Sequence, residues 1–282
     1  MWKEYRPVVE NQIQLDDLAY MDEYWTRVWQ GQSNLPSDGR GVTAELAAGL
    51  ATWVKKREEY PAIQEYLSEI PRDGRVLDGG SGLGKWVLWW KSLGYEAVGL
   101  DISQQTVDRL NGIFPGNLFI CGDIRTTGFP GGHFDAYTSW GAFEHFEEGL
   151  GGCFREAARI LKPRGLLFVS VPFQNRRFIQ KSMKSLGRWK LRYDPLGGYT
   201  APVRFHQWRL TESELHHEFA LHGFEMLSIR PIHRRSGLHW MLEEEFRLVR
   251  GSMAHKLAYS VSRPLLAARH VAHMILGVGR KR

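Results

Sequence analysis

The chain has 282 residues, 43% of them hydrophobic, which is enough to bury a core, and its formal net charge is +6. That charge is uneven, because residues 246–282 hold eight Lys/Arg and no acid, whereas residues 1–245 hold 29 basic against 31 acidic residues. Two cysteines and a charged start without an apolar signal segment favour a cytoplasmic protein, and the lack of a long uncharged apolar run argues against a membrane-spanning helix.

Residues 1–70 form the first predicted unit, a helical cover ahead of the main domain. It contains the aromatic stretch "YMDEYWTRVW". We interpret Tyr24, Trp25 and Trp29 in this stretch as core-packing residues, since aromatic side chains bury large apolar surfaces.

A core domain is predicted over residues 71–245, where short apolar runs alternate with amphipathic segments as in repeated βα units. The expected strands are "RVLD", "EAVGLD", "LFICGD", "DAYTSW", "LLFVSVP" and "FEMLSI". Helices are expected at Lys85–Leu93, Gln104–Asn111, Gly152–Leu161 and Thr211–Leu221, and Thr211 with Glu214 fits a capping box.

The glycine loop "VLDGGSGLGKW" follows the first of these strands. Gly79 to Lys85 fits G-x-x-x-x-G-K, but Trp86 stands where a phosphate loop needs a hydroxyl. The dinucleotide pattern G-x-G-x-x-G fails because Lys85 stands at its last glycine. The loop does fit D-x-G-x-G-x-G at Asp78, Gly80, Gly82 and Gly84, which lets backbone approach a ligand without an intervening Cβ.

Two more aspartates follow the next two strands. Asp101 ends "EAVGLD" and Asp123 lies in "CGDI". Parallel strands bind ligands at their carboxyl ends, so all three aspartates are expected at one edge of the sheet. Each of them could instead cap the helix that follows.

Together these motifs resemble the class I S-adenosylmethionine-dependent methyltransferases over roughly residues 75–232, where "FDAYTSWGAFEHF" and "LKPRGLLFVSVP" also look like family motifs. The resemblance implies an α/β, Rossmann-like, doubly wound and mostly parallel seven-stranded sheet. It also implies that Asp101 binds the ribose hydroxyls and Asp123 the adenine amino group, with Ile102 and Ile124 on the ring. The implied cofactor-binding residues are Asp78, Gly80, Ser81, Gly82, Asp101, Ile102, Asp123, Ile124, Ser139 and Trp140.

Methyl transfer is an in-line displacement, so the protein mainly aligns the acceptor and excludes water, and a hydroxyl acceptor gains from a base. We expect Glu144, His145 and His206 as catalytic candidates, against the alternative that they serve capping and packing. "GAFEHF" also resembles the cyclopropane and mycolic acid synthases, in which its glutamate helps to hold a bicarbonate. No metal site is expected.

A substrate lid is predicted over residues 173–210. Residues 174–193 hold seven Lys/Arg, no acid, and the aromatics Phe178, Trp189 and Tyr193. Such a segment could bind a phosphate or carboxylate of the acceptor, contact an anionic membrane, or form a solvated helix.

Residues 246–282 are predicted to be a basic amphipathic extension. On a helical projection, one face holds Leu257, Val261, Leu265, Ala268, Val271, Ala272, Ile275 and Leu276. This pattern is typical of an interfacial helix on anionic lipid, and equally of a helix packed on its own core or in a homodimer.

The sequence therefore predicts a methyltransferase that uses S-adenosylmethionine and modifies an oxygen or nitrogen of a small-molecule or lipid-linked acceptor, with an anionic group as one option. A nucleic-acid methyltransferase and a non-catalytic cofactor-binding adaptor are the alternatives. Nucleic acid is the less favoured partner because no nucleic-acid-binding module is recognised.

Overall fold

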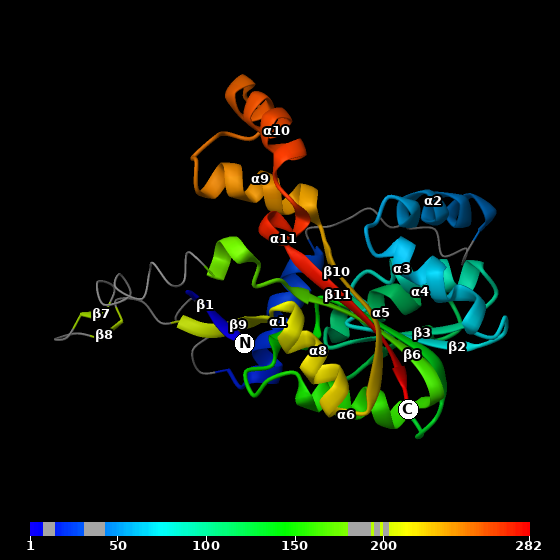
Figure 1. The fold of residues 1–282 in the computed structure, drawn as a ribbon. Helices are drawn as coiled ribbons and strands as arrows, with labels where there is room; N and C mark the ends of the chain where they lie inside the picture. Colours follow the sequence, from blue (N-terminus) through cyan, green and yellow to red (C-terminus); the bar gives the residue numbers. More distant parts are fainter. Residues whose placement is uncertain (8–14, 31–42, 180–192, 195–197, 200–202) are drawn as a thin grey trace.

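A seven-stranded sheet forms the centre of the computed structural model, which describes residues 1–7, 15–30, 43–179, 193–194, 198–199 and 203–282 (Figure 1). Its strand order is β10-β11-β6-β5-β2-β3-β4. Strands β2 to β6 run parallel, and β11 runs antiparallel to both of its neighbours. The strands are β2 (Arg75–Gly79), β3 (Glu96–Asp101), β4 (Phe119–Cys121), β5 (Phe134–Trp140), β6 (Leu161–Pro172), β10 (Phe224–Ile232) and β11 (Met274–Lys281).

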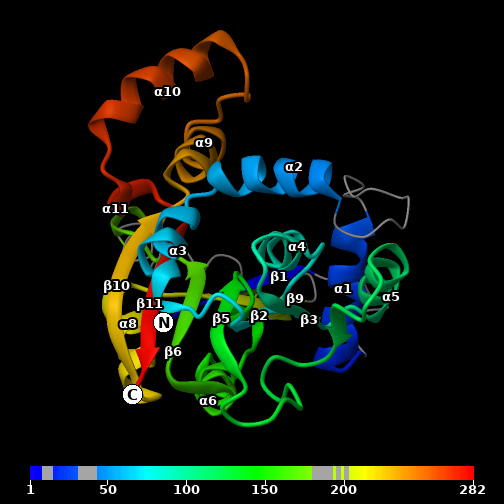
Figure 2. The ribbon, with the colours of Figure 1, turned by 90° about the vertical axis from the view of Figure 1, so that its right-hand side faces the viewer.

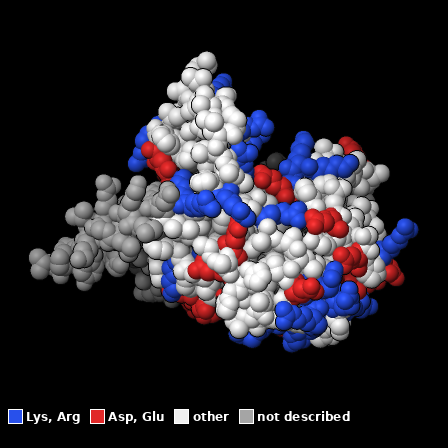
Figure 3. Space-filling model, viewed as in Figure 1, with Lys and Arg blue, Asp and Glu red and all other residues white. Residues whose placement is uncertain are grey.

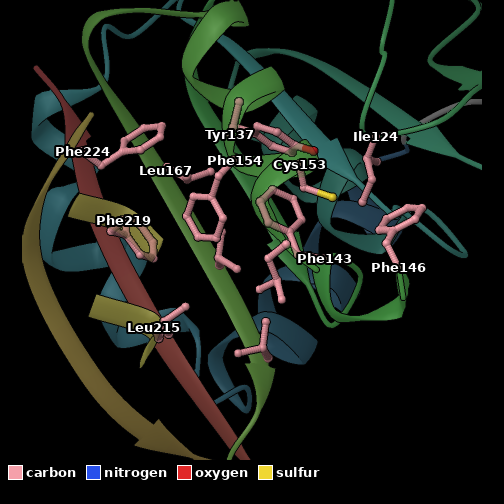
Figure 4. Close-up of a cluster of buried hydrophobic side chains, with 14 of the residues drawn as sticks. Ile124, Tyr137, Phe143, Phe146, Cys153, Phe154, Leu167, Leu215, Phe219 and Phe224 are labelled. Atoms are coloured by element: carbon pink, nitrogen blue, oxygen red, sulfur yellow. The ribbon is translucent and has the colours of Figure 1, made fainter. Parts of the chain in front are cut away.

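Helices cover both faces of the sheet, as predicted for a doubly wound fold. Adjacent strand residues alternate between two cores: Val76 packs with the helices α2, α3, α4 and α5, whereas Leu77 packs with α6 and α8. Figure 4 shows the second core, where Phe154 and Phe219 meet beside Leu167. The helices are α2 (Ala44–Lys55), α3 (Tyr60–Tyr66), α4 (Lys85–Ser92), α5 (Gln104–Ile113), α6 (Gly151–Ile160) and α8 (Glu212–Leu221), with short 3-10 turns η2 (Leu67–Glu69) and η3 (Phe143–His145).

The predicted core elements are confirmed. Each of the six expected strands and four expected helices is present, with boundaries shifted by a few residues. Helix α8 starts with the predicted capping box, in which Thr211 and Glu214 bind each other's backbone N–H groups.

The N-terminal cover is not wholly helical, which corrects the prediction for residues 1–70. Strand β1 (Trp2–Pro7) pairs antiparallel with β9 (Val203–Arg209), and helix α1 (Asp17–Gln30) follows. This small ribbon joins the start of the chain to the end of the expected lid insertion, so its pairing spans about two hundred residues and leaves no local sequence signal.

The expected lid insertion, residues 173–210, is described only in part. It includes β9 and a short pair of strands, β7 (Tyr193–Asp194) and β8 (Gly198–Tyr199). Residues 180–192, with Trp189 and five of the seven Lys/Arg, lie outside the described residues.

The prediction of one amphipathic helix running to Leu276 is wrong. Helix α10 (Met253–Leu265) ends earlier, α11 (Ala268–Val271) is a single turn, and β11 then runs between β6 and β10. Ile275 and Leu276 are fully buried strand residues on opposite faces of the sheet. The sheet therefore extends past residue 245, where the core was expected to end.

Helices α9 (Arg234–Glu244) and α10 form a hairpin between β10 and β11, which projects away from the sheet in both views (Figures 1 and 2). Within the described residues, no helix is both long and apolar enough to cross a membrane.

Candidate active site

A cavity of about 400 Å³ opens at the carboxyl ends of β2, β3 and β5. This is the edge at which open α/β sheets bind ligands. The lining side chains and loops come from α1, the segment after α2, the glycine loop, and the ends of β3, β4 and β5. Of the predicted cofactor-binding residues, the lining includes Asp78, Gly80, Ser81, Gly82, Asp101, Ile102, Ile124 and Trp140.

The glycine loop needs its glycines for its own conformation, and the predicted approach of its backbone to a ligand stays a prediction. Gly80 and Gly82 adopt φ of +75° and +51°, in the left-handed region that side chains rarely enter. A Cβ on Gly80 would lie 2.5 Å from the Cβ of Ala142, and one on Gly82 would lie 2.7 Å from the Trp29 ring. Both glycines are therefore required by the loop itself, apart from any ligand.

Asp78 and Asp101 are buried carboxyl groups at the floor of the cavity. Thr138 donates to Asp78 (2.7 Å), and the N–H groups of Gly82 (2.7 Å) and Ser103 (3.0 Å) donate to Asp101. Burial raises the pKa of Asp78 to about 7 and raises that of Asp101. Asp101 thus ties the glycine loop to the turn after β3, while the N-cap of α5 is Ser103 and not Asp101, and the Asp101 side chain still lines the cavity.

Two predicted cofactor residues point elsewhere. Asp123 forms an ion pair with Arg125 (2.7 Å) and does not line the cavity, although its neighbours Gly122 and Ile124 do. The Ser139 hydroxyl donates to the Gly79 carbonyl (2.9 Å) and joins β5 to β2. Their predicted contacts with the cofactor stay predictions.

The three catalytic candidates lie together beyond β5. His145 lines the cavity, and its Nδ1 lies 2.6 Å from the His206 carbonyl, while the two rings are 5.2 Å apart. Glu144 is adjacent, with its Oε1 3.9 Å from Nε2 of His145. A carbonyl only accepts hydrogen bonds, so Nδ1 of His145 carries a proton, and in the neutral ring the lone pair is then on Nε2.

Glu144 is 2% exposed, and its Oε2 has no hydrogen-bond partner among the described residues. Burial raises its pKa to about 8, against a smaller opposite effect of Arg209. At neutral pH this carboxyl is therefore mostly protonated and neutral.

Sequence reasoning missed much of the cavity wall. Trp25 and Trp29, interpreted as core residues, line the cavity while stacking on each other (5.6 Å between rings), and Trp25 also contacts the His145 ring (5.0 Å). A second wall combines Trp53 and Trp86 with the cations Arg57 and Lys85, both of which lie over the Trp53 ring. The only signal for this wall was the position of Lys85 and Trp86 directly after the glycine loop.

The lining suits a polar cofactor with a positive centre. Ser81 Oγ, Trp29 Nε1 and Trp140 Nε1 are buried atoms without a hydrogen-bond partner in the described part of the chain, and all three residues line the cavity. Buried polar atoms usually have partners, so they favour a bound polar molecule. Two buried carboxyl groups and several aromatic faces favour a sulfonium or ammonium group. No group of three or more His, Cys, Asp or Glu that could hold a metal occurs among the residues described.

Comparison with known proteins agrees with this geometry. Residues 77–169 match the family model of a methyltransferase domain. No curated protein matches the chain.

Solved structures share the fold at low sequence identity. A geranyl diphosphate C-methyltransferase from Streptomyces coelicolor, in complex with S-adenosyl-L-homocysteine, has a TM-score of 0.55 and 16% identity over 93% of this chain and 98% of that one. S-adenosylmethionine-dependent methyltransferases from Mesorhizobium loti (TM-score 0.51, 16% identity, 81% of this chain and all of that one) and Archaeoglobus fulgidus (0.51, 17%, 78% and 92%) are similar. These likenesses show the fold that the chain shares with S-adenosylmethionine-dependent methyltransferases, and residues 77–169 within it match a methyltransferase domain.

Proposed function

We propose that the chain is an S-adenosylmethionine-dependent methyltransferase that modifies an oxygen or nitrogen of a small-molecule or lipid-linked acceptor, and that His145 takes the proton of that acceptor. The observation that carries the proposal is the hydrogen bond between His145 Nδ1 and the His206 carbonyl. It fixes the tautomer in which Nε2 can accept a proton, on a residue that lines the cavity.

The buried carboxyl of Glu144 is the weaker candidate for this base. With a pKa of about 8, it holds its proton at neutral pH and cannot take another. We assign it the role of a neutral neighbour of His145, and we assign His206 a positioning role through its backbone carbonyl.

The cofactor supplies an electrophilic sulfonium methyl group when it is bound. Gly80, Ser81 and Gly82 would hold it from the loop, Asp101 would accept from its ribose hydroxyls, and Ile102 and Ile124 would pack on its adenine. Trp25, Trp140 and His145 would then bound the space beside the methyl group and exclude water from it.

An acidic group on the acceptor is supported by two arginines at the carboxyl end of β6. The Arg177 and Arg209 guanidinium carbons each lie 4.5 Å from the Phe178 ring centre, and both side chains are largely buried. Glu245 binds Arg177 (2.5 Å) and Glu4 binds Arg209 (3.0 Å). Nε and Nη2 of Arg177 remain buried without a hydrogen-bond partner among the described residues, so a phosphate or carboxylate could engage them.

The test is formation of S-adenosylhomocysteine by the purified protein with phenol, amine and isoprenoid phosphate acceptors. With the best acceptor, His145→Ala should lower kcat about 10²-fold with little change in cofactor affinity. The matched control is His222→Ala, since His222 stacks on Phe154 (5.5 Å between rings) and does not line the cavity.

Equal activity of His145→Ala and His222→Ala would refute His145 as the base. Methylation of oligonucleotides, with none of the small-molecule acceptors, would favour the nucleic-acid alternative. Cofactor binding without methylation of any class of acceptor would favour the non-catalytic adaptor.

A further inference from the structure

The hairpin of α9 and α10 exposes an apolar ridge that the methyltransferase reaction does not use. Among the described residues, seven large hydrophobic side chains are more than half exposed, and six of them lie between residues 246 and 265. This apolar ridge consists of Phe246, Val249, Met253, Leu257, Val261 and Leu265. The spacing of four residues places the four ridge residues of α10 on one face of the helix.

The opposite face of α10 anchors it to α9. His255 is buried there, its ring lies parallel to His239 (5.0 Å), and Tyr259 stacks on the same histidine (4.3 Å). Leu238, Met241 and Leu242 of α9 form the small core beneath. The hairpin therefore holds its ridge outward, which excludes the alternative that α10 packs this face on its own core.

The charged residues of α10 beside the ridge are all positive, whereas Glu243–Glu245 precede the ridge at its start. At 100° per residue, Lys256 and Arg263 fall together at one margin of the ridge, and both are exposed. No acidic residue follows Glu245, and of the three glutamates that end the α9 segment, Glu243 faces Arg250 and Glu245 binds Arg177. Figure 3 shows the projecting hairpin mostly white, with blue at its margins and red near its base.

The hairpin leaves the sheet at the edge where the active site lies. Ile232, the last residue of β10, pairs with Met274, the first of β11, and Met274 pairs with Pro172 at the carboxyl end of β6. The ridge and the cavity are thus at the same end of the parallel strands.

We propose that the apolar ridge docks on an anionic lipid surface, with Lys256 and Arg263 at the headgroups. An apolar face with basic margins is the pattern of interfacial helices. A second copy of the chain is the less favoured occupant, because a 13-residue helix offers a footprint of about 20 by 10 Å, whereas a stable dimer needs roughly 800 Å² per partner. Docking would present the active-site edge to the membrane, where a lipid-linked acceptor resides.

The test is co-sedimentation of the full chain with vesicles of phosphatidylcholine alone and of equal parts phosphatidylcholine and phosphatidylglycerol. The protein should bind the second kind, and added salt should weaken binding. The double variant Leu257→Asp/Leu265→Asp should reduce the fraction of protein bound to the vesicles at least about tenfold. The double variant Lys256→Glu/Arg263→Glu should reduce binding roughly tenfold, and only on the vesicles that contain phosphatidylglycerol.

The matched control is Leu221→Asp on α8, because Leu221 is 64% exposed, close to the 68% of Leu257, but lies outside the ridge. It should bind like the unmodified chain. Failure of the unmodified chain to bind anionic vesicles, or equal loss in Leu221→Asp, would overturn the proposal. A dimer that Leu257→Asp converts to monomer, without vesicle binding, would assign the ridge to a second copy instead. Since no acceptor is added, the outcome is independent of the proposed base.

Discussion

Glu144 makes a residue-scale prediction about pH. In the unfolded chain its pKa is near 4.5, and in the folded chain about 8. Between these values the folded chain holds the extra proton, so the free energy of unfolding should fall as pH rises, by up to about 1.4 kcal/mol per unit. The Glu144→Gln variant has no proton to lose at this position, so at pH 8 its free energy of unfolding should exceed that of the unmodified chain by a few kcal/mol. At pH 4 the two proteins should be equally stable. Denaturant titrations across this range provide the measurement, and parallel curves for the two proteins would contradict the raised pKa.

Asp101 makes a second prediction at this scale. Asp101→Ala should weaken S-adenosylmethionine binding by about 1–3 kcal/mol, because hydrogen bonds to the charged carboxylate would be lost. Calorimetry of the variant beside Asp108→Ala, which changes an exposed aspartate of α5, separates cofactor contact from general charge. If Asp101 only accepts hydrogen bonds from the N–H groups of Gly82 and Ser103, the Asp101→Ala variant should be less stable, but its folded fraction should bind the cofactor with unchanged affinity.

The sequence predicted those site residues whose position follows from strand ends. Asp78 and Asp101 lie at the carboxyl ends of β2 and β3, Gly80 and Gly82 follow β2 directly, and all four line the cavity. Asp123 could not be judged, because its pairing with Arg125 depends on side-chain geometry that spacing does not encode. Trp53 and Arg57 were missed because they reach the cavity only after α2 has packed on α4, a contact between segments with no shared motif.

At the scale of elements, the core βα units were predictable and the strands with distant partners were not. Strand β11 has the sequence "MILGVGRK", in which Ile275 and Leu276 continue the apolar face of the predicted helix before it. Hydrophobic periodicity alone cannot distinguish a short buried strand from a helix. Its partners, β10 and β6, lie about fifty and about a hundred residues away along the chain. Strand β1 was not predicted for the same reason, because its partner β9 lies about two hundred residues away in the sequence.

The position of β11 predicts a severe effect of truncation. A chain that ends at His273 loses the strand between β6 and β10, including the fully buried Ile275, Leu276 and Val278. Burial of three such side chains contributes about 5–9 kcal/mol, comparable to the stability of a whole domain. We expect loss of cooperative unfolding by circular dichroism. A chain that lacks only Arg282, which is exposed beyond the end of β11, is the control and should unfold cooperatively.

For the whole molecule, cofactor binding should stabilise the fold, because the cavity joins α1, the glycine loop and three strand ends. Ligand at a hundred times its dissociation constant adds about 2.7 kcal/mol, which corresponds to a rise in Tm of roughly 5 °C for a chain of 282 residues. Thermal melts with S-adenosylhomocysteine measure this, and Asp101→Ala should show a smaller rise at the same concentration. An equal rise with ATP or a nicotinamide dinucleotide would count against the selectivity of the site.

The position of β11 between β10 and β6 also orders the events of folding during synthesis. The ribosome releases β2 to β6 and then β10 well before Met274–Lys281, yet β10 joins the sheet only through β11. During that interval one edge of β6 is unpaired, and the apolar residues of this strand, which are buried in the finished fold, are exposed. Such edges can pair with other chains. A slow step before β11 is made, or a premature stop within the α9–α10 hairpin, should therefore produce aggregates rather than a smaller folded protein.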